Sequence, residues 1–288
     1  MKKFFGIIGL IVTFVVFSAC GNNEDATSPT VGGIVSIMPS PTEILVALGF
    51  GDSIIATDET SANIAGIDPT IATLSAWGLD LEYIITLNPD LVIASEMIAF
   101  AGDPLEPLAS LGINVVYIAD SSSIDDIRSD IRQIAEIVGA FDAGEALVAQ
   151  MDAEIDAVHQ IVQGITQRPT VYFEIWPLFT VGGGTFLNEL IEIAGGENIT
   201  GHLDSWPNIS DEFVLTANPD VILTSTDPNY SESPVDEILH RTGWGGVAAV
   251  VSGRVYQIDT DTSNRPTHNV VQALWQIARA IHPEYFVD

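Results

Sequence analysis

Two stretches of the chain, residues 33–122 and 169–288, alternate short apolar runs with segments whose apolar residues recur at helical spacing. The runs are rich in β-branched residues and lack polar alternation, which is typical of strands covered on both faces. They predict strands at Gly33–Met38, Leu91–Ile93, Asn114–Ile118, Thr170–Ile175, Val221–Leu223 and Arg254–Ile258. Because strands and helices alternate, each stretch predicts an α/β lobe built on a parallel sheet.

The two lobes repeat one plan, which is clearest where residues 79–95 (LDLEYIITLNPDLVIAS) align with residues 209–225 (ISDEFVLTANPDVILTS). Each copy predicts a short helix with an N-cap, Asp80 or Ser210, followed by an Asn-Pro-Asp turn and a buried strand. A second pair of matched segments, at 43–52 and 189–198, predicts a helix stopped by glycine in each lobe. This self-similarity indicates two copies of one structural unit.

The segment between the lobes, residues 123–168, has apolar residues at helical spacing and no strand pattern. A single helix over about residues 143–165 would be roughly 30 Å long at 1.5 Å per residue. A helix of that length predicts a stiff connection between the lobes, with little hinge closure.

The N-terminus has the features of a signal peptide. Lys2 and Lys3 precede an apolar run, Phe4–Phe17, that is shorter than the ~20 residues a membrane span needs. Two small residues then precede Cys20, which resembles a bacterial lipoprotein cleavage box and predicts a lipidated Cys20 after removal of residues 1–19. Residues 20–32 are polar and predict a flexible tether. An ordinary secretory signal with an incidental cysteine is the alternative.

The charge of the chain excludes several classes of function. It has 39 acidic residues against 9 Lys and Arg, a formal charge of −30. Without residues 1–19 it has no lysine and seven arginines against the same 39 acids, so the charge becomes −32. Such a chain would repel nucleic acid, and its single Cys excludes a disulfide framework. A lysine-free acidic surface also suggests a saline or alkaline habitat, where arginine stays charged and acids aid solubility.

The order of these segments resembles the helical-backbone class of ABC-importer substrate-binding proteins, which includes cobalamin, haem and ferric-siderophore binders. The matching motifs are Ser36-Ile-Met-Pro-Ser-Pro-Thr-Glu43, Leu81-Glu82, Asn88-Pro-Asp90, Gly184-Thr-Phe-Leu-Asn-Glu189, Ala194-Gly-Gly-Glu-Asn-Ile199, Trp206-Pro-Asn-Ile-Ser210, Asn218-Pro-Asp220 and Asn264-Arg-Pro266. The resemblance spans about residues 32–286 and implies two Rossmann-like parallel-sheet lobes joined by a single long helix. It also implies a monomeric, extracytoplasmic, membrane-anchored receptor that delivers a chelate to a permease, without a resident cofactor.

Two pairs of acids occupy equivalent places in the lobes. In the family, an acid at the place of Glu82 and Glu212 docks onto arginines of the permease, and the resemblance carries that role here. The alternative is that both acids only stabilise a helix N-terminus. For the other pair, Ser40 to Glu43 has the pattern of a capping box, which would give Glu43 a structural role, and docking by Glu43 and Glu189 is the alternative.

The ligand is expected between the lobes, at the carboxyl ends of the strands. The candidate ligand-binding residues follow strands or lie in adjacent loops: Met38, Pro39, Ser40, Trp77, Trp176, Phe179, Trp206, Arg265 and His268. Their tryptophans suit a large flat ligand, although a core position is the alternative for each of them. Trp244 and Trp275 are expected in the core, and Tyr172 and Tyr230 are further candidate haem ligands.

Two alternative functions remain open at this stage. A receptor of the same architecture for bare Zn or Mn is disfavoured because the five histidines form no spaced cluster. A cleft enzyme is disfavoured because the chain has no G-x-S-x-G, H-E-x-x-H, Walker or dinucleotide-binding motif.

Overall fold

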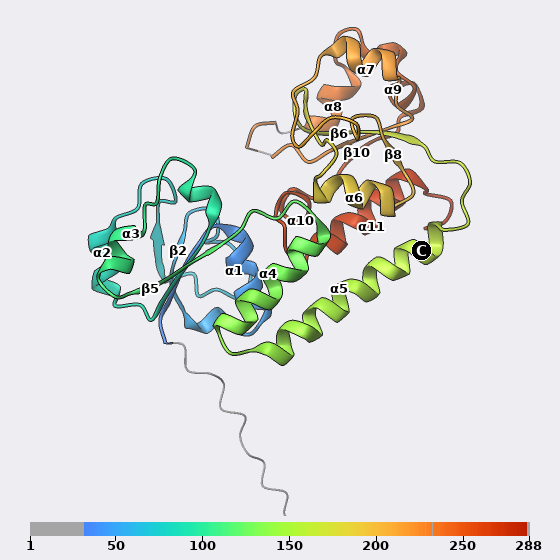
Figure 1. Ribbon diagram of the computed structural model, residues 1–288. Coiled ribbons are helices and arrows are strands. Elements are labelled where there is room, and N and C mark those ends of the chain that lie inside the picture. Colours follow the sequence, from blue (N-terminus) through green and yellow to red (C-terminus); the bar gives the residue numbers. More distant parts are fainter. Residues whose placement is uncertain (1–31, 228, 232, 287–288) are drawn as a thin grey trace, which may run out of the picture.

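The computed structural model describes residues 32–227, 229–231 and 233–286. Two α/β lobes lie side by side, and the long helix α5 (Phe141–Val162) runs from below the N-terminal lobe along the C-terminal lobe (Figure 1). The expected fold class and its long helix are thus confirmed, with α5 beginning and ending two to three residues before the predicted bounds. None of the described helices is long and apolar enough to span a membrane. The signal peptide and Cys20 lie outside the described residues.

The N-terminal lobe has a parallel five-stranded sheet in the order β3-β2-β1-β4-β5. Its strands are β1 (Ile34–Ile37), β2 (Ile54–Asp58), β3 (Ala72–Leu74), β4 (Leu91–Ser95) and β5 (Asn114–Ile118). Its helices are α1 (Pro39–Ala47), α2 (Leu81–Leu87) and α3 (Glu106–Ser110), with two short 3₁₀ helices, Gly51–Ser53 and Glu96–Ala99. The carboxyl ends of the parallel strands therefore meet at one edge of the lobe.

The C-terminal lobe repeats this plan on a sheet with the order β10-β9-β6-β7, in which β8 also pairs with β6. Its strands are β6 (Thr170–Trp176), β7 (Phe179–Thr180), β8 (Glu197–Asn198), β9 (Val221–Thr224) and β10 (Val255–Gln257). Its helices are α6 (Phe186–Ile193), α7 (Asp211–Ala217), α8 (Pro234–Leu239), the 3₁₀ helix Trp244–Gly246, α9 (Ala248–Ser252), α10 (Thr260–Asn264) and α11 (Val270–Ile281). Only β7 runs antiparallel, because it turns back directly from the end of β6.

The repeated segments fold alike, as the sequence predicts. Asp80 and Ser210 are the N-caps of α2 and α7, and their side chains accept hydrogen bonds from Tyr83 N (3.0 Å) and Phe213 N (3.3 Å). Both helices end at an asparagine in the left-handed conformation, with φ of 49° in α2 and 47° in α7. The helix therefore stops at this asparagine, which tolerates positive φ, before the proline of the motif.

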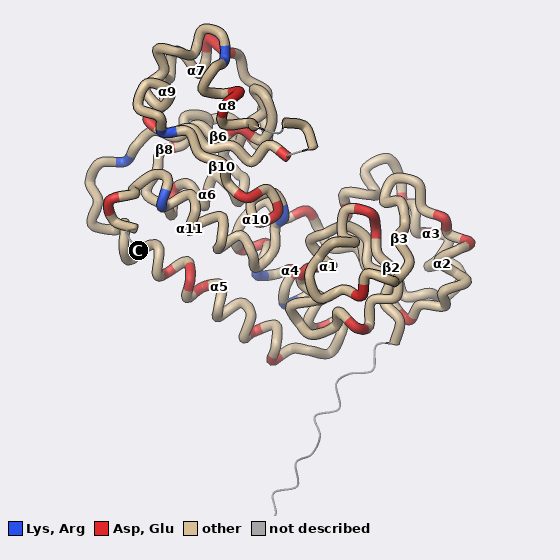
Figure 2. The backbone as a smooth tube through the Cα atoms, turned by 180° about the vertical axis from the view of Figure 1, so that it is seen from behind, with Lys and Arg blue, Asp and Glu red and all other residues tan. Residues whose placement is uncertain are grey.

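A continuous apolar core joins the two lobes. The helix α4 (Ile124–Ile137) packs on both α1 and α5, and α5 packs on α6 and α11. Ile131, Met151 and Ile277 belong to one hydrophobic cluster that also contains strand residues of both sheets. Moving one lobe against the other would disturb this packing, which favours the stiff connection that the sequence predicts. Acids are spread over both lobes, and arginines are few (Figure 2).

Candidate functional site

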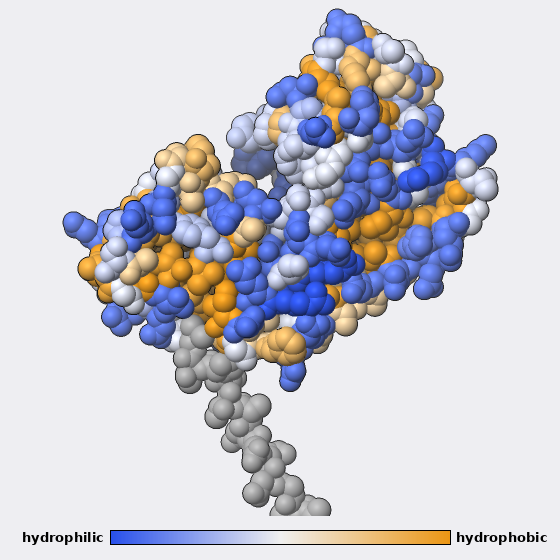
Figure 3. All heavy atoms as spheres, in the orientation of Figure 1, coloured by the Kyte–Doolittle hydropathy of each residue, from blue (hydrophilic) through white to orange (hydrophobic). Residues whose placement is uncertain are grey.

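A cavity of about 530 Å³ lies between the lobes, in the range typical of small-molecule sites. Figure 3 shows the surface hollowed between the two lobes. The cavity lies at the carboxyl ends of the strands, because segments directly after β1, β2 and β5 and the last residues of β4 and β6 line it. This is the place where loops of an α/β sheet form ligand sites.

Seven of the nine candidate ligand-binding residues line this cavity: Met38, Pro39, Ser40, Trp176, Phe179, Trp206 and Arg265. Trp77 and His268 do not. Trp77 follows the edge strand β3, and its 60 % exposed side chain packs edge-on against Phe100. His268 comes after the turn at Pro266 and faces hollows beside α5 and α1, where burial lowers its pKa.

Aromatic side chains of the C-terminal lobe form one wall of the cavity. The rings of Trp176 and Phe179 are stacked, with centroids 4.0 Å apart and an interplanar angle of 6°. Trp206 packs edge-on against Phe186, with ring centroids 6.1 Å apart. Trp176 is 48 % exposed and lines the cavity, so the part of its ring that does not stack on Phe179 is accessible to a ligand. Such a wall can bind a large planar or apolar-rimmed molecule.

A buried carboxylate supports this aromatic wall. Leu178, in the turn that joins Trp176 to Phe179 along the chain, has a φ of 62°, and its amide donates to Glu174 Oε2 (3.1 Å). Arg241 binds both oxygens of Glu174 at 2.7 Å, and the hydroxyl of Tyr172 donates to the same carboxylate (2.9 Å). Tyr172 is fully buried in this network, which raises its pKa, so the structure contradicts its candidacy as a haem ligand. Tyr230 is exposed and does not line the cavity.

The N-terminal lobe has the same arrangement, in which a buried carboxylate accepts a hydrogen bond from the amide of a residue with positive φ. Met38 has a φ of 81°, unusual for a residue with a side chain, and its amide donates to Asp58 Oδ2 (2.7 Å). Asp58 is fully buried and also accepts hydrogen bonds from Thr60 and from Ser61 Oγ (2.5 Å). Each lobe therefore holds a positive-φ residue beside the cavity with a buried carboxylate.

Polar groups that the sequence did not identify line the N-terminal wall. Asp120 Oδ1 accepts a hydrogen bond from Ser95 (2.8 Å), and the buried Asp130 accepts one from Ser121. Burial raises the pKa of Asp130 to about 6, with nearby acids adding to the effect and the Ser121 hydrogen bond opposing it. Asp130 has a sequence signal, since it is a charged residue on the buried face of α4 beside Ile127 and Ile131.

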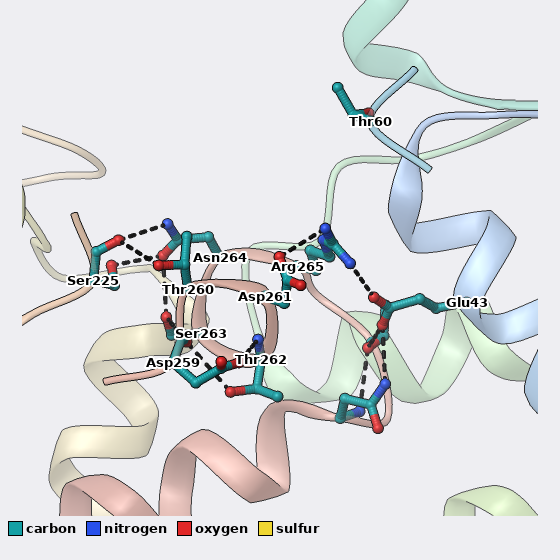
Figure 4. Close-up of polar contacts among 12 residues, drawn as sticks. Glu43, Thr60, Ser225, Asp259, Thr260, Asp261, Thr262, Ser263, Asn264 and Arg265 are labelled. Carbon is teal, nitrogen blue, oxygen red and sulfur yellow. Dashed lines mark hydrogen bonds and ion pairs between the residues drawn. The ribbon is translucent and has the colours of Figure 1, made fainter. Parts of the chain in front are cut away.

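The capping box predicted at Ser40 to Glu43 is wrong. The helix α1 begins at Pro39, two residues earlier, because proline fits the first turn of a helix, and its N-cap is Met38. Glu43 instead accepts hydrogen bonds from the C-terminal lobe, from Arg265 Nη1 (2.7 Å), Thr267 Oγ1 (2.9 Å) and Asn269 Nδ2 (3.0 Å). Figure 4 shows Glu43 reaching Arg265 across the interface.

The equivalent acid of the C-terminal lobe also bonds across the molecule. Glu189 Oε2 accepts a hydrogen bond from the amide of Ile124 (2.9 Å), the first residue of α4. Since α4 packs on α1, this contact joins α6 to the N-terminal half of the molecule. Glu43 and Glu189 therefore hold the lobes together, a role that the sequence did not predict.

Glu82 and Glu212 lie in the first turns of α2 and α7, at the outer ends of the two lobes (Figure 1). Both are exposed, and within the described part of the chain neither forms an ion pair. Exposed apolar side chains, Tyr83 and Ile85 on α2 and Leu215 on α7, lie beside them. Each lobe thus presents a free carboxylate within a partly apolar surface.

The remaining expectations concern tryptophan burial and metal ligands. Trp244 is fully buried, as expected, whereas Trp275 is half-buried and donates to Glu154 Oε2 (2.8 Å). Among residues 32–227, 229–231 and 233–286, no group of three or more His, Cys, Asp and Glu side chains is placed to hold a metal ion.

Known proteins share this sequence pattern and fold. Residues 34–262 match the family model described as periplasmic binding protein. An uncharacterized ABC transporter substrate-binding lipoprotein of Bacillus subtilis is 27% identical over the full length of both chains. A vitamin B12-binding protein of Yersinia pestis is 31% identical over 71% of this chain and 72% of its own. The periplasmic haem-binding protein RhuT of Roseiflexus is 29% identical, with a TM-score of 0.74 over 88% of this chain and 99% of its own.

Proposed function

Since this chain belongs to the periplasmic binding protein family and is a substrate-binding protein of an ABC importer, we propose that it captures a metal chelate in the cavity between its lobes. The chelate is a corrinoid, a haem or a ferric siderophore. One observation carries this proposal: a cavity of about 530 Å³ with a stacked aromatic wall lies between the lobes. Vitamin B12 and haem, which relatives of this chain are named for binding, are large ring systems that such a wall suits.

Intrinsic tryptophan fluorescence tests this proposal, because Trp176 and Trp206 line the cavity. We expect at least one of cyanocobalamin, haemin and a ferric siderophore to quench the mature protein saturably. Trp206→Phe should reduce the amplitude of quenching, whereas the matched control Trp77→Phe, away from the cavity, should reduce it less. If none of the three chelates quenches, the proposed ligand class is wrong.

The permease-docking role of Glu82 and Glu212 is part of the proposal. Their exposure and their positions at the outer ends of the two lobes support it, since a permease has to reach both lobes at once. Two carboxylates held apart by a stiff molecule would fix the orientation of the docked protein through charge complementarity. Delivery then requires the permease to draw the ligand from the cavity while both acids stay engaged.

The N-terminal sequence supports a proposal for the location of the protein. We infer that residues 1–19 are removed and that Cys20 is lipidated, with residues 20–32 as a tether, so that a monomer works outside the cytoplasm on the membrane. A metabolic label with a fatty-acid analogue should mark the protein and should be lost in Cys20→Ala. Secretion of an unlabelled wild-type protein would contradict the anchor.

A further inference from the structure

This inference rests on the proposed function, the capture of a chelate in the cavity, and concerns the charge of that chelate. We propose that Asp120 and Asp130 determine specificity by accepting hydrogen bonds from N–H groups of a chelate without net negative charge and by excluding anionic chelates. Corrinoids, whose rim carries neutral carboxamides, have this chemistry, and so do cationic ferric hydroxamates. Haem, which carries carboxylates, and ferric tris-catecholates, which are polyanions, do not.

The two aspartates line the cavity, and each carboxylate has one oxygen that can still accept a hydrogen bond. Ser95 donates to Oδ1 of Asp120 (2.8 Å), and Ser121 donates to Oδ2 of Asp130. The second oxygen of each carboxylate has no hydrogen-bond partner within residues 32–227, 229–231 and 233–286. These oxygens are available to N–H donors of a bound molecule, and charge-assisted hydrogen bonds of this kind are the strong ones.

Burying the ionised carboxylate of Asp130 costs free energy of folding, which supports a role for this residue beyond the stability of the fold. The residue is buried, with a relative exposure of 7%. Burial raises its pKa, and Asp126, Asp120 and Glu96 raise it further. An asparagine of the same shape would avoid this cost, so a carboxylate here indicates a functional use of its charge.

Positive charge on the cavity wall is already neutralised. Arg265 is the cationic residue among those lining the cavity in the described part of the chain. Its Nη1 binds Glu43 and its Nη2 binds Asp261, both at 2.7 Å (Figure 4). Since the guanidinium is shared by two carboxylates, the three side chains together have no net positive charge that could attract an anionic ligand.

The other cations of the mature chain lie elsewhere. It has no lysine, and its six remaining arginines do not line the cavity. Arg128, Arg132 and Arg241 pair with carboxylates, Arg168 and Arg254 donate to backbone carbonyls, and Arg279 lines a separate hollow. An anionic chelate would therefore meet two carboxylates and no uncompensated arginine, and repulsion in a partly buried site is weakly screened by salt.

Calorimetric titration of the mature protein with four probes tests this inference. Cyanocobalamin is neutral, ferrioxamine B is cationic, and haemin and ferric enterobactin are anionic. We expect cyanocobalamin or ferrioxamine B to bind at least tenfold more tightly than either anionic probe. Whichever of these two binds more tightly then indicates the class of the natural ligand. Asp130→Asn should lower the affinity for the preferred probe at least fivefold and should reduce the ratio between this affinity and the affinity for the anionic probes.

A matched control separates specificity from folding. Glu136→Gln removes an acid from the exposed face of the same helix, α4, and should leave all four affinities unchanged. Thermal unfolding of Asp130→Asn checks that the variant is folded, and Asp120→Asn provides a second test at the other carboxylate.

The failure of this inference can be told apart from that of the proposed function. If no probe binds, the proposed function fails and the inference falls with it. If an anionic probe binds most tightly, the function stands and the inference is overturned. An equal loss of affinity for every probe in Asp130→Asn would also overturn it, because a purely structural role predicts that result.

Discussion

The chain has glutamates at equivalent positions of its two lobes twice, and the two pairs lie in opposite surroundings. The outer pair, Glu82 and Glu212, is exposed at the start of α2 and α7. The inner pair, Glu43 and Glu189, lies at the interface of the lobes, where each acid accepts hydrogen bonds from the opposite half of the molecule. Repetition in the sequence marks both pairs equally, so it cannot separate their roles.

The neighbours of each acid make the difference. Glu43 lies among Thr42, Ile44 and Leu45, which are all buried, so the face of α1 that carries it packs inward. A carboxylate on such a face needs internal partners, because an unpaired buried charge is strongly destabilising. Glu82 is itself exposed and is followed by the partly exposed Tyr83, so its carboxylate needs no internal partner. The inner pair is thus placed to stabilise the contact between the lobes, whereas the outer pair, for which we propose docking, lies on the surface.

Charge reversal of the outer pair should have the largest effect on transport. In Glu82→Arg with Glu212→Arg, the repelled permease can no longer dock, so uptake by whole cells should be lost. Ligand affinity, measured by titration, should stay within about twofold, because mutations this far from a site act independently of it. Glu136→Arg, an exposed acid on α4, is the control. Normal uptake by the double variant would contradict a docking role for the outer pair.

Removal of the inner acid Glu43 should have the largest effect on stability. Glu43→Ala leaves Thr267 and Asn269 without their acceptor and breaks a buried ion pair with Arg265, so we expect a loss of about 3 kcal/mol in the free energy of unfolding. Urea denaturation measures this. The control Glu82→Ala, at an exposed site, should change stability by less than ~0.5 kcal/mol. Equal effects of the two variants would erase the distinction between the pairs.

Removal of Glu189 should cost less than removal of Glu43. Its carboxylate satisfies one backbone amide at the N-terminus of α4, a contact worth about 1 kcal/mol, like an N-cap. Urea denaturation of Glu189→Ala, beside Glu212→Ala, measures the difference. A loss as large as that of Glu43→Ala would show that the two inner acids share the interface equally.

The smallest effect concerns pH. The pKa of Asp130 is about 6 in the folded protein, above its ordinary value of 3.8, so the folded state holds this proton more tightly than the unfolded state. Its contribution to stability is complete below pH 3.8 and is lost as the pH rises through about 6. Asp130→Asn should therefore melt at a higher temperature than wild type at pH 7.5, with the difference shrinking towards pH 4. Identical melting curves at both pH values would contradict the raised pKa.

Much of the fold could be predicted from the sequence because the two lobes repeat each other. The caps at Asp80 and Ser210 and the strands β4 and β9 are confirmed, since each rests on local signals present twice. The strands β2, β3, β7 and β8 were missed. β3 has only three residues and β7 and β8 have two each, and β2 ends in polar Thr57 and Asp58, whose burial depends on tertiary contacts.

The cavity could be predicted only in part. The position of strand ends identified Met38 and Trp176, and applied to β4 and β5 it would also have indicated Ser95 and Asp120. His268 lies three residues from Arg265 yet does not line the cavity, and it lines the hollows beside α5 and α1 instead. The contact of Glu43 with Asn269 joins residues 226 positions apart, and no local pattern reports such a pair.

Hydrogen exchange of the mature protein with and without bound chelate tests the central claim most directly. If the ligand lies between stiffly joined lobes, protection should rise in the segments 38–41, 119–121 and 176–179, each of which contributes residues to the cavity wall, and should stay unchanged along α5. Protection confined to the hollow beside His268, or a broad change along α5, would contradict a cavity held between fixed lobes.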